Sequence, residues 1–200
     1  VRPLGFLSEV KQAVQNTPYE MFGMPIQNDS HEYLVYLLDQ FHEAIKQEAP
    51  FEPGTISPHA TPYEKMRILA ENGWNRFYSK NQSEVVRLFF GMIRKTIECT
   101  GCHSVSYQWE VFNTLKIPCE GTTFYDWIKR EVNEESTIEG YQCDACHGKH
   151  TATLQSHVWK MPPHLFITLR RFQYDGTKNM SPCPYDGQPL SFDKIGRAHV

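Results

Sequence analysis

Cys99-Thr100-Gly101-Cys102 and, further along the chain, Cys143-Asp144-Ala145-Cys146 form two C-x-x-C pairs. Each pair falls where a predicted strand ends and the chain turns back. A C-x-x-C turn directs two thiolates at one centre about 2.3 Å from each sulfur, and two such turns complete a tetrahedron. We therefore predict that Cys99, Cys102, Cys143 and Cys146 together bind one structural zinc ion, Zn2+.

The 40 residues from 103 to 142 separate the two pairs. This spacing exceeds that of a usual zinc ribbon, so we predict an inserted segment with a helix over Thr122–Val132. A redox site is the rival interpretation, but it needs only one C-x-x-C pair and usually opens a helix. Structural disulfides are rare in intracellular proteins, and we expect this chain to be intracellular.

Two histidines and two further cysteines lie outside this set. His103 and His147 directly follow the pairs and are alternative ligands, although four thiolates already close a zinc site. Cys119 and Cys183 have no Cys, His or Asp at chelating spacing. We expect them to be small buried side chains or incidental loop thiols.

Composition limits the class of protein. The 200 residues are 40% hydrophobic, enough for one sizeable core or two subdomains. The net charge is −3 and no Lys/Arg cluster occurs, which argues against a nucleic-acid partner. Arg87 interrupts the longest apolar stretch, Val85–Ile93, so we expect no membrane-spanning segment.

Apolar residues recur at helical spacing in the first half of the chain. The clearest helix opens at Asp29 or Ser30 and must end by Pro50. Its predicted apolar stripe consists of Leu34, Leu37, Leu38, Phe41 and Ile45. Further helices are predicted over residues 4–14, 63–78 and 84–89, with an exposed proline-rich loop over 50–62.

Strand patterns begin at Met92, where Ile93, Lys95 and Ile97 alternate with more polar neighbours. A second strand is predicted over residues 107–115, with a bulge, and a third over 151–159. The nearly continuous apolar run 165–169 is expected of a strand buried on both faces.

Four motifs follow one another in a characteristic order. They are Gln27-Asn28-Asp29-Ser30-His31-Glu32-Tyr33-Leu34, Ser83 with Leu88-Phe89-Phe90-Gly91, the two C-x-x-C pairs, and Leu169-Arg170-Arg171-Phe172-Gln173-Tyr174-Asp175. This series resembles the ubiquitin-specific protease (ubiquitin carboxyl-terminal hydrolase) family of cysteine deubiquitinases. The resemblance runs over residues 3–193 and makes the chain an internal fragment of the catalytic domain.

The resemblance implies an α+β fold, a papain-like hand with thumb, fingers and palm that is truncated here at both ends. Residues 1–88 would form thumb helices, residues 89–160 the zinc-binding fingers, and residues 161–194 the beginning of the palm sheet. Residues 195–200, Ile-Gly-Arg-Ala-His-Val, can be encoded by a common sequencing adapter. We expect a non-native tail there, and an ordinary surface tail is the alternative.

The resemblance also implies an activity and a partner. The family hydrolyses the peptide or isopeptide bond after the C-terminal glycine of ubiquitin, inside the cell, in cytoplasm or nucleus. Nothing like its Gly-x-x-Cys-x-x-Asn or Gly-Gly-His-Tyr segments occurs in these 200 residues. We therefore expect no catalytic residue here and no hydrolase activity from this polypeptide alone. The alternatives are a ubiquitin-binding pseudoenzyme and an unrelated zinc-ribbon interaction module.

The first motif supplies two predicted substrate contacts. Asp29 would meet the arginine-bearing tail of ubiquitin, and its local alternative is to cap the helix that follows. Gln27 would bond the backbone of the tail, while Asn28 departs from the second Gln of the family. His31 lies on the first helical turn, and we expect it to be solvated rather than catalytic.

The last motif supplies three more predicted substrate contacts. Arg171, Phe172 and Tyr174 match family positions that line the tail channel, although plain core packing is the alternative for Phe172. On a strand, Phe172 and Tyr174 share a face and Arg171 points to the other. Trp74 and Trp159 are expected to be core residues.

Overall fold

The computed structural model describes residues 3–118, 135–170 and 177. The chain forms two compact units, Val1–Ile45 and Lys46–Val200. Several predicted features lie outside the described residues, namely the helix over 122–132, Cys119, Cys183, Arg171, Phe172, Tyr174 and the tail 195–200.

The first unit contains α1 (Leu4–Val14), the short helix η1 (Glu20–Gly23) and α2 (Ser30–Ile45). Val10 and Val14 of α1 are buried against Tyr36 of α2, with the rings of Phe22 and Tyr33 packed beside them. Both helices predicted in this region are confirmed, and an aromatic cluster joins them.

The predicted apolar stripe of α2 is wrong over its last turns. Leu38 is buried, but the side chains of Phe41 and Ile45 are 54% and 49% exposed. Tyr36 is buried instead, because its ring packs 4.9 Å from the ring of Tyr19. A pattern that counts only aliphatic residues and Phe does not detect a face built from tyrosines.

The second unit begins with the predicted loop and two helices, α3 (Pro62–Lys80) and α4 (Glu84–Phe89). A capping box starts α3, in which the Thr61 hydroxyl accepts from the Glu64 N–H and the Glu64 carboxylate accepts from the Thr61 N–H. The Ser83 hydroxyl accepts from the Val86 N–H, so it caps α4.

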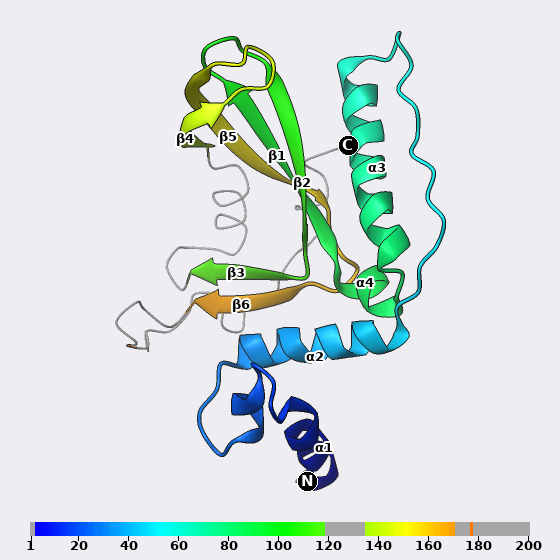
Figure 1. The fold of residues 1–200 in the computed structure, drawn as a ribbon, viewed down its shortest axis with the longest axis vertical. Coiled ribbons are helices and arrows are strands. Elements are labelled where there is room, and N and C mark those ends of the chain that lie inside the picture. The colour runs from blue at the N-terminus through cyan, green and yellow to red at the C-terminus, as the bar shows by residue number, and fades with distance from the viewer. Residues whose placement is uncertain (1–2, 119–134, 171–176, 178–200) are drawn as a thin grey trace, which may run out of the picture. The chain divides into compact units, whose positions relative to one another are not determined.

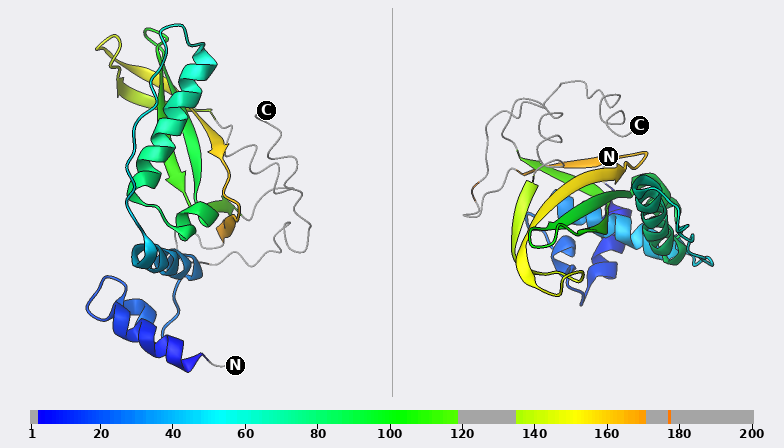
Figure 2. Two further views of the ribbon diagram at one scale, coloured as in Figure 1. Left: turned by 90° about the vertical axis from the view of Figure 1, so that its right-hand side faces the viewer. Right: turned by 90° about the horizontal axis from the view of Figure 1, so that it is seen from above.

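Four antiparallel strands form the main sheet, in the order β2-β1-β5-β4 (Figure 1). Their bounds are Gly91–Cys99 for β1, Val105–Phe112 for β2, Glu135–Gln142 for β4 and Lys149–Lys160 for β5. The β1–β2 and β4–β5 turns lie at the same end of the sheet. The helix α3 runs beside β2 (Figure 2), where Gly73 lets the helix approach Trp109.

A second, two-stranded sheet pairs β3 (Thr114–Pro118) with β6 (Phe166–Arg170) in parallel. The single strand predicted over residues 107–115 is therefore wrong, because the chain changes sheet at Asn113. The prediction that β6 is buried on both faces is also wrong, since Phe166–Leu169 are only half-buried. Within this pair, the core consists of Leu115 and Ile117.

Gly91 begins β1 at a point where the backbone leaves no room for a side chain. A Cβ at this position would lie 2.5 Å from the Lys160 carbonyl oxygen and 2.6 Å from the ring of Phe112. The Lys160 carbonyl oxygen belongs to the backbone of β5, so it cannot move aside as a flexible side chain could. This close approach explains why glycine ends the Leu88-Phe89-Phe90-Gly91 motif.

Replacing Gly91 by Ala should lower the free energy of unfolding of the second unit by about 1–3 kcal/mol, the usual cost of overpacking. Urea unfolding followed by tryptophan fluorescence measures this unit, because all four tryptophans lie after residue 45. Gly54→Ala is the matched control in the same unit, since a Cβ there makes only ordinary contacts, the nearest at 3.4 Å from the Asn72 side chain. Equal midpoints for Gly91→Ala and the unchanged chain would contradict the prediction.

Candidate metal centre

The two C-x-x-C turns share one backbone geometry. In the first, the Cys99 N–H donates to the Ser104 carbonyl (3.0 Å) and the His103 N–H donates to the Cys99 carbonyl (2.8 Å). In the second, the same two bonds join Cys143 with Gly148 (3.0 Å) and His147 with Cys143 (2.8 Å). Each turn thus presents its two thiols from a closed loop at the end of a strand, and we call these loops the two knuckles, 99–104 and 143–148.

The histidines serve the turns rather than the ligand set. His103 and His147 have φ values of 56° and 55°, which place both in the left-handed region as the knuckle closes. The His103 Nδ1 atom lies 3.1 Å from a Glu98 carboxylate oxygen. Among the described residues, the group able to hold a metal ion consists of the four cysteines without either histidine.

The four sulfurs have the spacing of a tetrahedral metal site. All lie within 4.8 Å of one another, and the Cys102 and Cys143 sulfurs are 3.7 Å apart. A tetrahedron with metal–sulfur bonds of about 2.3 Å has edges of about 3.8 Å. Cys99 and Cys143 are buried while Cys102 and Cys146 are exposed. The predicted four cysteines are therefore positioned to bind one metal ion.

Hydrogen bonds and neighbouring groups shift the pKa values of the cluster's thiols in different directions. The Ser104 hydroxyl lowers the pKa of Cys143 to about 6, with the backbone N–H of Cys146 adding to the effect. The Ser104 hydroxyl also lowers the pKa of Cys102. The Gly148 N–H favours the Cys146 thiolate, but partial desolvation and the neighbouring thiols Cys102 and Cys143 outweigh it and raise the pKa of Cys146 to about 11. Four thiolates this close repel one another, and a divalent cation removes that penalty.

One side chain lies against both knuckles. The ring of His150, on β5, lies against both Gly101 and Gly148. A Cβ at Gly101 would come within 2.7 Å of three ring atoms, and a Cβ at Gly148 would come closer still. Glycine at these two positions lets the imidazole pack between the loops.

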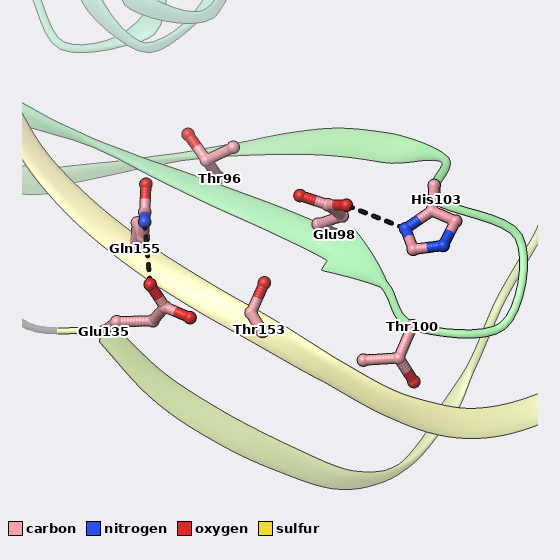
Figure 3. A pocket seen from close by; sticks show the side chains of 7 residues that line it. All are labelled: Thr96, Glu98, Thr100, His103, Glu135, Thr153 and Gln155. Carbon is pink, nitrogen blue, oxygen red and sulfur yellow. Dashed lines mark hydrogen bonds and ion pairs between the residues drawn. The ribbon is translucent and has the colours of Figure 1, made fainter.

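A polar pocket of about 300 Å³ lies on the sheet beside the knuckles (Figure 3). Its lining residues are Thr96, Glu98, Thr100, His103, Glu135, Thr153 and Gln155. Both carboxylates already have partners, because Glu98 pairs with His103 and Glu135 accepts from Gln155 at 3.0 Å. The lining contains no cysteine, so this pocket offers no thiol nucleophile.

The first motif lies at the start of α2, in the other unit. The Asp29 carboxylate accepts from the His31 N–H at 2.7 Å, so Asp29 caps the helix. The Asn28 side chain donates to the carbonyls of Met21 (3.0 Å) and Ile26 (3.2 Å) and thereby closes the preceding loop. Gln27 and Asp29 are exposed, and their role as substrate contacts stays a prediction.

The expectation that His31 is solvated is wrong. Only 8% of this residue is exposed. It shares the buried face of α2 with Leu38 and His42, which follow it at helical spacing. Its position on the first turn suggested exposure, but the direction of its side chain around the helix decides its burial.

The sequence prediction missed Ser104, whose hydroxyl contacts two sulfurs of the cluster. The only signal for it is a serine two residues after the second cysteine of a knuckle. This serine can be recognised as a partner of the cluster only when the structure shows that the other knuckle lies next to it.

Fold and site together define an α+β domain with a four-cysteine metal ribbon. A sequence model of the family described as ubiquitin carboxyl-terminal hydrolase matches residues 3–186. The chain belongs to this family, and the predicted ubiquitin-specific protease fold is confirmed.

Curated relatives agree with this assignment. Ubiquitin carboxyl-terminal hydrolase 4 of Vanderwaltozyma polyspora is 29% identical over 170 residues, which cover 80% of this chain and 19% of the relative. Ubiquitin carboxyl-terminal hydrolase Usp2 of Drosophila melanogaster is 27% identical over 199 residues, covering 94% of this chain and 20% of the relative. The chain thus spans about a fifth of the length of these proteins.

Solved structures show the same fold. A SAGA DUB module of Ubp8, Sgf11, Sus1 and Sgf73 bound to monoubiquitin matches with a TM-score of 0.55 at 19% identity, over 88% of this chain and 35% of that chain. The same module bound to ubiquitin aldehyde gives a TM-score of 0.54 at 19% identity, over 87% of this chain and 33% of that one. Within the described part of this chain, no helix has the length and apolarity needed to cross a bilayer.

Proposed function

We propose that this chain is part of a cysteine-type deubiquitinase that hydrolyses the peptide or isopeptide bond after the C-terminal glycine of ubiquitin. The observation that carries the proposal is the family match over residues 3–186. The two knuckles, with four sulfurs at metal-binding distances, agree with it. The intact protein would act inside the cell, in the cytoplasm or the nucleus.

The metal in this proposal is one structural zinc ion. Four thiolates fill a tetrahedral coordination shell and leave no open position for water or substrate. The ion then stabilises the fingers, residues 89–160, between the thumb helices of residues 1–88 and the palm strand that begins in residues 161–194. It takes no part in bond cleavage.

Ubiquitin is the proposed partner, and Gln27, Asp29, Arg171, Phe172 and Tyr174 are its proposed contacts. The matching modules that hold monoubiquitin and ubiquitin aldehyde support this partner. Asp29 uses one carboxylate oxygen, Oδ1, to cap α2 and is exposed. Its charge therefore remains available to an arginine of the ubiquitin tail.

Purified chain should contain one zinc ion per molecule, and a chelator should unfold the fingers, because a structural zinc site contributes roughly 10–16 kcal/mol to folding. Metal analysis and circular dichroism before and after chelation measure both effects. Absence of zinc together with an unchanged spectrum after chelation would overturn the zinc assignment.

Residues 1–194 alone should not hydrolyse a fluorogenic ubiquitin substrate. The proposed chemistry needs a cysteine thiolate, a histidine base and a residue that orients it, and the family segments that carry the first two do not occur in this sequence. Turnover that survives inhibitor controls for contaminating proteases would refute this prediction.

Replacing Asp29 by Ser in the intact catalytic domain should lower kcat/KM for ubiquitin substrates roughly tenfold, since a charge-assisted hydrogen bond contributes about 1.5–3 kcal/mol. Serine keeps the cap and removes only the charge. Asp29→Ala removes both and serves as the comparison, with helix content followed by circular dichroism. Unchanged kcat/KM in Asp29→Ser would limit Asp29 to its capping role.

A further inference from the structure

The two knuckles differ at the position whose carbonyl closes each loop. Ser104 and Gly148 each follow the first cysteine of their knuckle by five residues, and each accepts the N–H of that cysteine at 3.0 Å. The backbone therefore makes the same hydrogen bond at both positions. Only Ser104 adds a side chain, and a Cβ at Gly148 would collide with His150.

The Ser104 side chain reaches across the centre to the other knuckle. Its Oγ atom lies 3.2 Å from the Cys143 sulfur and 3.1 Å from the Cys102 sulfur. The hydroxyl therefore bridges one proposed ligand from each knuckle. This contact between the two turns does not involve the metal itself.

A hydroxyl has one proton to donate, and burial decides which sulfur receives it. Cys102 is exposed, so water can solvate its thiolate, whereas Cys143 is buried with 2% exposure. A buried charge without a hydrogen-bond donor is costly. When a metal ion holds all four sulfurs as thiolates, the Ser104 hydroxyl therefore stabilises the site most by donating its proton to the Cys143 thiolate.

We propose that Ser104 is a positioning residue of the metal centre, which donates a hydrogen bond to the Cys143 thiolate and slows loss of the ion. Four thiolates around a divalent cation carry a net charge of −2, and a donor to one sulfur offsets part of it. The inference rests on the proposed metal binding of this chain. It assigns Ser104 a role in retaining the metal ion, which the spacing of the four cysteine ligands does not reveal.

The test compares three variants of the 200-residue chain. Ser104→Ala removes the hydroxyl, and Ser104→Thr keeps it. Ser106→Ala is the matched control, because its hydroxyl lies 3.3 Å from the Tyr141 hydroxyl and contacts no sulfur of the cluster. Zinc release to a chromogenic chelator should be about tenfold or more faster in Ser104→Ala, since partners of metal ligands typically contribute 10–100-fold to affinity.

A cobalt spectrum separates positioning from plain stability. Loss of the donor raises the energy of the sulfur electrons, so the sulfur-to-cobalt charge-transfer band of Ser104→Ala should shift to longer wavelength. Ser104→Thr should restore both band and release rate, and Ser106→Ala should change neither.

Two results would overturn the proposal while the metal site stands. One is a release rate in Ser104→Ala equal to that of the unchanged chain, and the other is faster release with an unshifted cobalt band. Failure of the unchanged chain to bind zinc or cobalt would overturn the metal assignment itself, and the role of Ser104 with it.

Discussion

The cluster of four cysteines is the constraint on which the far end of the main sheet depends. This sheet joins two hairpins, β1–β2 and β4–β5, through the β1–β5 ladder, and each hairpin turn carries one knuckle. The outer strands β2 and β4 contain no fully buried residue. Hairpins with so few buried side chains are marginal in water. A metal ion held by four sulfurs would cross-link both turns, and His150 and Ser104 already fix their separation.

The opposite end of the sheet depends on packing instead. Trp109 and Trp159 meet edge to face at 5.5 Å, and the Arg94 guanidinium lies 5.8 Å from the Trp159 ring. Burial lowers the pKa of Arg94, and contact with aromatic faces compensates part of the lost hydration. The Lys160 ammonium lies 3.3 Å from the centre of the Trp74 ring on α3, so the same kind of contact joins helix and sheet. The expectation that Trp74 and Trp159 are core residues is wrong, because both are only half-buried, and both serve as partners for cations.

The sequence was informative where chemistry or periodicity imposes a spacing. Chelation requires two cysteines per turn, so all four sulfurs of the cluster were predictable, and the 3.6-residue period located α1, α2 and α3. The bounds of β4 were not predicted, because an exposed edge strand needs no apolar alternation, and Glu135–Gln142 contains little of it. The change of sheet at Asn113 depends on pairing with β6, fifty residues on, which no local pattern records. Ser104 belongs to the same class, since its partner Cys143 lies in the other knuckle.

Asp29 and Ser104 each carry a side-chain group that their local backbone structure does not require. An N-cap needs only a side-chain oxygen, which serine, threonine or asparagine can supply as well as aspartate. Asp29 therefore brings to the start of α2 a charge that the capping bond itself does not require, although the charge also favours the helix dipole. A knuckle needs only a backbone carbonyl at its sixth and last position, as Gly148 demonstrates, yet Ser104 brings a hydroxyl into contact with two sulfurs. In both cases the backbone would close equally well with a simpler residue. For Ser104 the contact with two sulfurs explains the extra hydroxyl, whereas for Asp29 the proposed ubiquitin contact would explain the extra charge.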